Sequence, residues 1–267
     1  MPELPEVETV VREILPELSG QFIADIDILW ERTFQNKSLD TLAGRQIKDV
    51  SRQGKYIIIE LSSTYLIIHL RMTGQLLFSL DGFDKKHVRM IIQLKNGRKL
   101  YFRDVRKFGR IYHVDDPQTV LENTGIDALD EANTEKYFLE LVKNRKLNIK
   151  TFLLSQKYIS GVGNIYADEC LFRAGLHPES VTGKIPKKRI KLLYNEIKYV
   201  LNFAIDNMGS TISDYRDAFG ESGSAQNFFK VYQRAGQACF ECGREIRKIK
   251  TAGRGTHFCA KCQKKYV

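Results

Sequence analysis

Two Cys-x-x-Cys pairs near the C-terminal end restrict what this part of the chain can fold into. Cys239 and Cys242 form the first pair, Cys259 and Cys262 form the second, and 16 residues separate them. This spacing is typical of a structural zinc site, in which four thiolates close the coordination shell of the metal. Gly243 follows the first pair directly, where a zinc knuckle needs a tight turn. The sequence therefore predicts a C-terminal zinc finger with one structural Zn²⁺ and no catalytic metal.

The surrounding residues leave two other interpretations of this module. His257 could replace one ligand, although four cysteines suffice, and one pair could act in redox chemistry, although two pairs favour metal. The fifth cysteine, Cys170, follows a helical pattern with Ala167, Leu171 and Ala174 and is expected in the core. Clustered cysteines in a chain without a secretion signal indicate a reducing compartment.

The chain is strongly basic, with 42 lysines and arginines against 32 aspartates and glutamates. Such an excess suits a polyanionic partner, either nucleic acid or an anionic membrane surface. No apolar run approaches the ~18 residues of a membrane span and no amphipathic basic helix stands out, so nucleic acid is favoured. The N-terminal residues lack a basic stretch followed by an apolar one, so we expect no signal peptide and a cytoplasmic location.

Hydrophobic periodicity divides the 267 residues into a β-rich first half and a helical second half. A helix is expected at residues 5–18, where apolar residues repeat at helical spacing before Gly20. Short β-branched runs dominate residues 22–114, and Asn96-Gly97 between two of them is a strong hairpin signal. The expected fold class is α+β, with a β-sandwich or barrel on which the first helix packs.

The second half follows a polar, irregular linker at residues 116–133. Helices are expected at about 134–145, 149–155, 165–174 and 186–208. Residues 209–231 show no period, and a loop of this length is usually functional or disordered. We therefore predict a β-sandwich domain at 1–115, the linker at 116–133, a helical domain at 134–230 and the zinc finger at 231–267.

The first residues contain a candidate nucleophile. If Met1 is removed, Pro2 becomes a free secondary amine. An α-amino group titrates near ~8, so much of it is neutral and nucleophilic at working pH. Glu3 and Glu6 are close to it in sequence, and the positive end of the helix disfavours an ammonium there. Taken alone, these residues fit an ordinary helix start with proline in the first turn better.

Basic and glycine-rich segments of the second half could hold phosphates. Ser160-Gly-Val-Gly-Asn164 turns into a helix whose first N–H groups would point outward, and Arg145 and Lys150 precede it. Between the cysteine pairs, two strands could present Arg254 and other cations to a DNA groove. The alternatives are a commonplace glycine turn and solvated surface charge.

Three side chains of the first half could fill a gap in a base stack. Arg106 and Phe108 are expected in a turn between strands, and Met72 follows another strand. A flipped nucleotide leaves a void that such residues can occupy. Lys55 starts an apolar strand after Gly54. For each of these residues alone, sandwich core or a surface ion pair is the simpler interpretation.

Several separated motifs recur together in one family. They are Pro-Glu-Leu-Pro-Glu-Val-Glu-Thr at 2–9, Gln53-Gly-Lys-Tyr56, Ile68-His-Leu-Arg-Met-Thr-Gly74, Asp104-Val-Arg-Lys-Phe-Gly109, Gly161-Val-Gly-Asn-Ile-Tyr-Ala-Asp-Glu169, Gly253-Arg-Gly-Thr256 and the four cysteines. Over nearly the whole chain they resemble the bacterial formamidopyrimidine-DNA glycosylases, base excision repair enzymes that remove oxidised purines such as 8-oxoguanine. The resemblance implies a helix-flanked β-sandwich, a helical domain with a helix–two-turn–helix motif and a zinc finger. A monomer would bind damaged double-stranded DNA in the cleft.

The resemblance also implies roles for the site residues. Pro2 would attack C1′ of the damaged nucleotide, Glu3 would protonate the sugar ring oxygen, and Glu6 would order the site. Lys55 would assist base release and β-elimination, and Arg254 would hold phosphates and act in δ-elimination. The remaining implied DNA contacts are His69, Lys150 and Asn164 on phosphates, Met72, Arg106 and Phe108 in the space of the flipped base, and His87 and Arg145. Residues 209–231 would form the loop that closes over that base, called the lesion loop below.

Departures from the family pattern bear on the range of lesions. The lesion loop reads Gly223-Ser-Ala-Gln-Asn-Phe-Phe229, where the family more often has an aromatic residue followed by glutamine. An endonuclease VIII-like enzyme, which prefers oxidised pyrimidines, is the nearest rival, although Leu4 with Met72, Arg106 and Phe108 favours the purine enzyme. A zinc-finger DNA-binding protein without catalysis would explain the charge and the cysteines, but not the N-terminal proline and carboxylates.

Overall fold

The computed structural model describes residues 1–35, 42–143 and 145–267, which form two compact units. The first unit comprises Met1–Asn123 and Ile205–Gln226, and the second comprises Thr124–Ala204 and Asn227–Val267. This division differs from the four predicted ranges, because most of the lesion loop returns to the first unit and the zinc finger belongs to the second. Side chains of the first helix bind the returning segment, and no local sequence pattern indicates these contacts.

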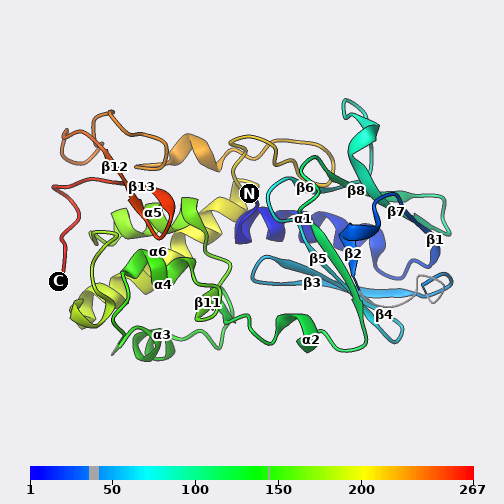
Figure 1. Cartoon of the computed structure of the whole chain (residues 1–267), viewed down its shortest axis with the longest axis horizontal. Coiled ribbons are helices and arrows are strands. Elements are labelled where there is room, and N and C mark those ends of the chain that lie inside the picture. The colour runs from blue at the N-terminus through cyan, green and yellow to red at the C-terminus, as the bar shows by residue number, and fades with distance from the viewer. Residues whose placement is uncertain (36–41, 144) are drawn as a thin grey trace. The chain divides into compact units, whose positions relative to one another are not determined.

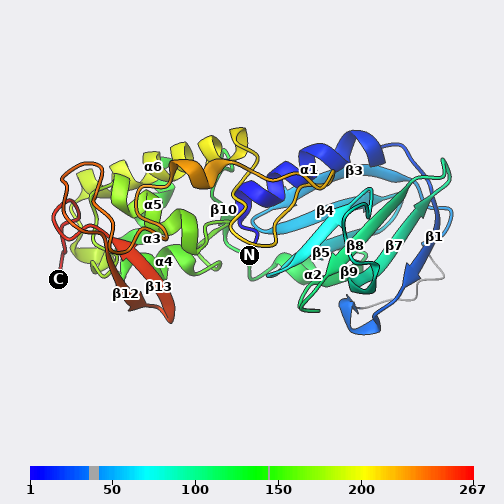
Figure 2. The same cartoon turned by 90° about the horizontal axis from the view of Figure 1, so that it is seen from above.

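The first unit is a β-sandwich with α1 (Leu4–Leu18) packed on it (Figures 1 and 2). Apart from a parallel pairing of β2 with β9, neighbouring strands in the two sheets are antiparallel. Within the described residues, one sheet has four strands in the order β1 (Ile23–Ile28), β7 (Val88–Leu94), β8 (Lys99–Asp104), β6 (Gly74–Leu77). The other sheet has five described strands in the order β2 (Phe34–Gln35), β9 (Arg110–Val114), β5 (Tyr65–His69), β4 (Tyr56–Leu61), β3 (Ile47–Gln53). The predicted α+β class with a helix-flanked sandwich is confirmed.

The core of this unit joins both sheets and the helix. α1 buries its apolar face, from Val7 to Leu18, and packs on β3. Along β4 every second residue is buried, as expected where one face of a strand meets the core. Gly97, at φ 87°, completes the tight turn predicted between β7 and β8. Part of the predicted β region, residues 36–41, lies outside the described residues.

The second unit is helical, and its helices agree with the predicted ranges to within a few residues. The predicted helix at 134–145 ends earlier, and position 144 lies outside the described residues. Its main elements are α3 (Glu135–Val142), α4 (Ile149–Leu154), α5 (Asn164–Arg173), most of α6 (Lys187–Asp206) and the hairpin of β12 (Arg247–Thr251) and β13 (Arg254–Phe258). None of the helices in the described ranges has the length and apolar character that a membrane span requires.

The predicted linker is more ordered than its composition suggested. It contains a short helix, α2 (Gln118–Leu121), and a short strand, β10 (Ile126–Asp127). β10 pairs in parallel with β11 (Ile159–Ser160), so the strand depends on a partner more than thirty residues away. The amino-acid composition of the linker indicates only its local conformational preference. The pairing of β10 with β11 could therefore not be predicted from the linker residues themselves.

Candidate active site and zinc centre

The N-terminal proline and its two carboxylates lie at the start of α1. Pro2 is buried and Met1 is exposed, whereas the side chains of Glu3 and Glu6 are only 2% and 1% exposed. The backbone N–H of Glu3 donates to Glu6 Oε2 at 2.8 Å. Glu6 therefore satisfies a donor that the helix itself leaves free, and it fixes the conformation of the chain next to Pro2.

The other oxygen of Glu6 holds the beginning of the lesion loop. Glu6 Oε1 accepts the backbone N–H of Ser210 at 2.7 Å and the Ser210 hydroxyl at 2.9 Å. Gly209 has φ 73°, and a Cβ on it would lie 2.8 Å from Cγ of Glu6. Only glycine allows this close approach without strain. One buried carboxylate thus connects the candidate nucleophile to the loop.

Lys55 lies in the two-residue turn between β3 and β4, next to Gly54 at φ 59°. Arg52 connects this turn to α1, because its Nη1 donates to the Gly54 carbonyl at 3.0 Å and its Nε donates to Glu8 Oε2 at 2.8 Å. Although burial raises the pKa of Glu8, hydrogen bonds from Arg52 and Arg12 hold it below its usual value. Glu8 is therefore charged, and it helps to place Lys55 relative to the N-terminal helix.

His69 ends β5 directly opposite Tyr56 and is buried. Burial, followed by the positive charges of Arg71 and Lys55, lowers the pKa of His69 to about 3. The neutral ring accepts the N–H of Arg71 at Nδ1, at 2.9 Å, so its proton must be on Nε2. His69 can therefore donate one uncharged hydrogen bond, which suits a phosphate oxygen.

The three predicted wedge residues lie on the surface of the first unit. Met72 is 37% exposed and Phe108 is 51% exposed, which is unusual for large apolar side chains of a folded core. Arg106 Nη1 is 3.6 Å from the Met72 sulfur, so the structure brings these two residues together. Exposed apolar groups beside a guanidinium are suited to contact bases.

A buried carboxylate that sequence reasoning missed shapes this wedge loop. Asp104 is fully buried and accepts the N–H of Gly109 at 2.7 Å, the N–H of Arg106 at 3.2 Å and the hydroxyl of Thr73. A Cβ at Gly109 would lie 2.4 Å from the Phe102 ring. The signal available in the sequence was an acidic residue at the start of a short turn that ends in glycine.

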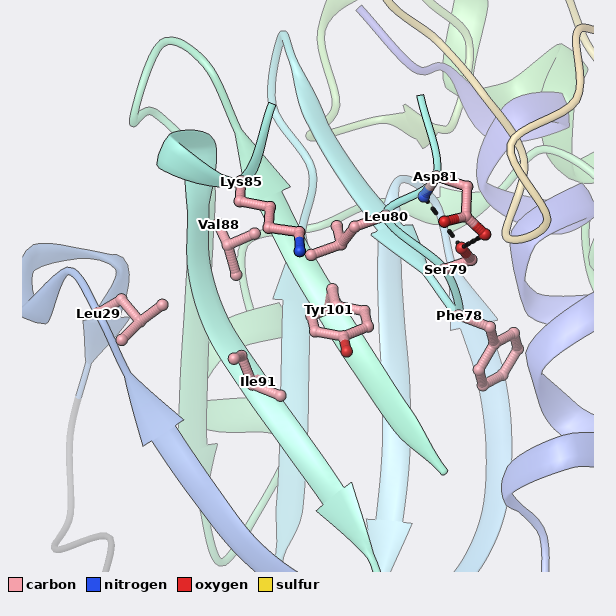
Figure 3. A pocket seen from close by; sticks show the side chains of 9 residues that line it. All are labelled: Leu29, Phe78, Ser79, Leu80, Asp81, Lys85, Val88, Ile91 and Tyr101. Carbon is pink, nitrogen blue, oxygen red and sulfur yellow. Dashed lines mark hydrogen bonds between the residues drawn. The ribbon is translucent and has the colours of Figure 1, made fainter. Parts of the chain in front are cut away.

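His87 lies in a 3₁₀ turn at Lys85–His87, where Nη2 of Arg89 is 3.4 Å from its Nδ1. The pocket beside this turn has a volume of about 440 Å³. Figure 3 shows the amino group of Lys85 near Leu80 and Tyr101 on this open side of the sheet. The pocket lining contains none of the predicted catalytic residues, so we place the chemistry at the N-terminal end of α1 instead.

Lys150, predicted as a phosphate contact, is buried within the second unit. It is fully buried, and its Nζ donates to Asp168 Oδ1 at 2.6 Å and to Thr256 Oγ1 at 2.8 Å. Asp168 Oδ2 also accepts the N–H of His257 at 2.8 Å. In this structure Lys150 therefore holds the β12–β13 hairpin against α4 and α5, and its phosphate role stays a prediction. Contacts between residues so far apart in sequence gave no local signal.

The hairpin presents Arg254 to solvent. Residues 252 and 253 form its two-residue turn, with φ 52° and 72°, and Arg254 follows with an exposed side chain. Nδ2 of Asn164, the first residue of α5, donates to the Gly255 carbonyl at 3.1 Å. The structure therefore brings Asn164 next to the backbone that carries Arg254, as required if both contact one DNA backbone.

Arg145 is half-buried and lies over the Tyr158 ring, with its guanidinium carbon 4.0 Å from the ring centroid. Its Nε donates to the carbonyl of Leu141. Stacking of this kind holds an arginine in one orientation while it keeps its charge. Arg145 remains a candidate DNA contact.

The four predicted cysteines converge in the second unit. Their sulfur atoms all lie within 4.8 Å of one another, with 3.9 Å between Cys239 and Cys262 and 3.4 Å between Cys242 and Cys259. A tetrahedral zinc ion with ~2.3 Å bonds separates its sulfur ligands by about 3.8 Å, so the four thiolates fit zinc. His257 contacts Asp168 and is not needed as a ligand. The cysteines form a closed, structural zinc site.

Fold and site together define a class of protein: a DNA-processing enzyme with a sandwich, a helical region and a zinc finger, whose candidate nucleophile is the amino terminus. Comparison with family models agrees. The formamidopyrimidine-DNA glycosylase N-terminal domain matches residues 1–111, its H2TH domain matches 124–216, and the zinc finger found in FPG and IleRS matches 236–265.

Individual proteins give the same result. The formamidopyrimidine-DNA glycosylase of Solibacter usitatus is 43% identical over 270 residues, covering 99% of this chain and 100% of the relative. A structure of a Lactococcus lactis mutant enzyme with DNA that contains Fapy-dG has a TM-score of 0.91 at 39% identity. A structure of the wild-type enzyme from the same organism, with DNA that contains an oxidised pyrimidine, has a TM-score of 0.90 at 38% identity. Each of the two matches covers 99% of this chain and 100% of the solved chain. The chain belongs to the formamidopyrimidine-DNA glycosylase family.

Proposed function

We propose that the protein is a bifunctional DNA glycosylase and AP lyase of base excision repair that removes oxidised purines, including 8-oxoguanine and formamidopyrimidines. The observation that carries this proposal is the arrangement around α1. Its N-terminal end holds Pro2 beside two buried carboxylates, while Glu6 and Glu8 connect it to the lesion loop and to the Lys55 turn. A nucleophilic amine, an acid and a cation are thereby fixed to one helix.

In the first reaction the Pro2 amine would attack C1′ of the damaged nucleotide. Glu3 would give a proton to the ring oxygen O4′ as the sugar opens, and Lys55 would assist departure of the base with the electrons of the glycosidic bond. The product is an iminium ion between the proline nitrogen and C1′. The requirement for a free amine means that Met1 must first be removed.

In the second reaction the iminium ion makes the protons at C2′ acidic. Loss of one of them would expel the 3′ phosphate by β-elimination, assisted by Lys55, and a further elimination, linked to Arg254, would expel the 5′ phosphate. Water then releases Pro2 from the sugar fragment. These steps need only acid–base and amine chemistry from the chain, so we assign the zinc site to the shape of the DNA-binding region.

Contacts to DNA would come from both units. His69, Asn164 and Arg145 are candidates for phosphates, Met72, Arg106 and Phe108 for the space left by the flipped base, and His87 for the flanking backbone. We infer that a monomer acts on double-stranded DNA. As a DNA repair protein with a thiolate zinc site, it would work in the bacterial cytoplasm, associated with the nucleoid while bound.

Oxidised pyrimidines form a second candidate substrate class. The wild-type Lactococcus lactis enzyme has been solved with DNA containing an oxidised pyrimidine, and this chain differs from the usual family pattern in its lesion loop. Excision of both classes should therefore be measured side by side. A strong preference for pyrimidines would exclude the purine assignment while leaving the Pro2 mechanism intact.

Sodium borohydride trapping tests the mechanism directly. Met1-free protein incubated with 8-oxoguanine duplex and borohydride should give a covalent complex, because hydride reduces the iminium ion to a stable amine. Protein that carries one extra residue before Pro2 is the matched control and should bind DNA but neither trap nor cleave it. Absence of trapping by correctly processed protein, or cleavage by the blocked protein, would refute Pro2 as the nucleophile.

A further inference from the structure

A pocket in the second unit contains none of the residues assigned to catalysis or to DNA contacts. It is lined by three cationic side chains, Arg173, Arg189 and Lys230, together with the acidic Glu241 and the buried Phe172, and its volume is about 440 Å³. We call it the cation pocket. Three positive charges against one negative charge attract an anion, and the aromatic lining suits a ligand that also carries an apolar group.

Arg189, in the first turn of α6, is held in place by the backbone beside it. Its Nη1 donates to the Ala174 carbonyl at 3.3 Å, and a Cβ at Gly175 would lie 3.2 Å from this nitrogen. Gly175 has φ 64°, so glycine provides both the conformation and the space. Within the described ranges, neither Arg189 nor Lys230 forms an ion pair. A guanidinium held in this way keeps further N–H donors for a carboxylate, which it can bind through two parallel hydrogen bonds.

Two of the cations contact exposed aromatic rings. The guanidinium carbon of Arg173 is 4.3 Å from the Tyr199 ring centroid, and Nζ of Lys230 is 5.2 Å from the Phe240 ring centroid. Tyr199 is 52% exposed and Phe240 is 64% exposed. Arg234 also lies over Phe240, with its guanidinium carbon 3.5 Å from the ring centroid, and helps to hold this ring. Exposed aromatic surface beside arginine is typical of surfaces that bind another protein.

Carboxylates beside the cations favour a peptide over a nucleic acid as the partner. Glu241 lines the pocket, and Glu196 forms an ion pair with Nε of Arg173. A nucleic-acid backbone carries a negative charge at every nucleotide and would be repelled by both carboxylates, whereas a peptide brings N–H donors that they can accept. The candidate DNA contact Asn164 begins α5 and Arg173 ends it, roughly 13 Å further along the helix axis. The pocket therefore lies at the other end of α5 from that contact.

We propose that the cation pocket binds an acidic segment of a protein partner, in which aspartates or glutamates flank a large apolar side chain. A carboxylate of this segment binds Arg189 and Lys230, while the apolar side chain packs against Phe172 and the exposed ring of Phe240. The inference goes beyond the proposed function, because the pocket contains none of the groups to which base excision is assigned. Contact of this kind attaches the enzyme to another protein while its candidate DNA contacts stay available.

Fluorescence anisotropy of a labelled peptide tests the proposal. The probe carries two aspartates on each side of one phenylalanine, and the full-length, zinc-loaded protein is first saturated with undamaged duplex so that its DNA contacts are occupied. Binding should weaken at least about tenfold when asparagines replace the aspartates, and about fivefold when alanine replaces the phenylalanine. Equal affinities for the aspartate and asparagine peptides would overturn the proposal.

Variants of the lining give matched comparisons. Arg189→Gln should weaken binding of the aspartate peptide about tenfold, whereas Lys188→Gln, which removes an exposed charge outside the lining from the same turn, should change it less than about twofold. Glu241→Gln removes the opposing charge and should strengthen binding about twofold, an effect that misfolding cannot imitate. Equal losses in Arg189→Gln and Lys188→Gln, or weaker binding by Glu241→Gln, would contradict the proposal.

Two further measurements separate the pocket from DNA processing. Arg189→Gln should keep its zinc and excise 8-oxoguanine within about twofold of the wild-type rate, since a surface substitution away from the reacting groups has a small effect. Loss of excision in a variant that keeps its zinc would instead make Arg189 part of the DNA-processing machinery. An oligothymidylate with the same charge as the peptide is the second probe. If it binds more tightly than the peptide and loses more affinity in Arg189→Gln, the pocket binds nucleic acid and the peptide assignment fails.

Discussion

The carboxylate of Glu6 accepts the backbone N–H of Ser210 at 2.7 Å although 204 residues separate the two in sequence. The same side chain accepts the N–H of Glu3 beside Pro2. Movement of the loop entrance and movement of the nucleophile are therefore coupled through one buried group. This gives a physical reason for a carboxylate at position 6 that does not require Glu6 to contact the substrate.

Replacement of Glu6 should damage stability and base excision together. Glu6→Ala leaves the N–H groups of Glu3 and Ser210 buried without acceptors, so we expect a loss of about 2–4 kcal/mol in the free energy of unfolding. Excision should fall at least about tenfold, the equivalent of ~1.4 kcal/mol in the transition state. Glu6→Gln retains only one acceptor oxygen and should be intermediate. Urea unfolding and single-turnover excision measure both effects, and a fully stable, fully active Glu6→Ala would contradict the coupling.

The elements that could be predicted from the sequence are those whose signal is local. The period of α1, the Asn96-Gly97 turn and the cysteine spacing each depend on residues close together in the chain, and the structure agrees with all three. The exposed Met72 and Phe108 were also identified, through the resemblance.

The features that were missed depend on contacts between distant residues. The lesion loop returns to the first unit through Glu6 and Glu13, and Lys150 is buried by Asp168 and Thr256, which lie 18 and 106 residues away. A single sequence shows that a lysine or glutamate is present, but it does not show which partner neutralises the charge. For that reason Lys150 could be taken for a surface cation.

Replacement of Lys150 should affect folding more than phosphate binding. Lys150→Met keeps most of the volume but leaves Asp168 as an unpaired buried charge, which should cost about 3–5 kcal/mol of stability. The dependence of DNA affinity on salt should be unchanged in the folded fraction, whereas Arg254→Ala should reduce the slope of log K against log salt by about 0.9. Fluorescence anisotropy from 50 to 200 mM salt distinguishes the two. A reduced slope in Lys150→Met would support the phosphate role instead.

Removal of zinc should disorder the hairpin that carries Arg254 and leave the sandwich folded. The cysteines close a small cluster with Phe172, Val231 and Ile246, and so small an apolar core is expected to depend on its metal. Chelation should therefore weaken DNA binding strongly while the unfolding transition of the first unit persists. Cys239→Ser should behave like chelated protein, and Cys170→Ser, away from the cluster, is the control for loss of a thiol. Undiminished DNA affinity after complete zinc removal would contradict this prediction.

The buried His69 should make folding stability depend on pH. Its pKa of about 3 lies below the value near 6.5 expected in the unfolded chain, so the unfolded state binds more protons between these two values. The stabilisation is complete above pH 6.5 and is lost as the pH falls toward 3. In His69→Gln the slope of stability against pH between 4 and 5.5 should be smaller by about one proton, or ~1.4 kcal/mol per pH unit. His177→Gln is the matched control, because His177 is less buried and its pKa is lowered mainly by that partial burial. Equal slopes in His69→Gln and the wild type would show that His69 is charged in the folded protein, and an uncharged donor to phosphate would then be excluded.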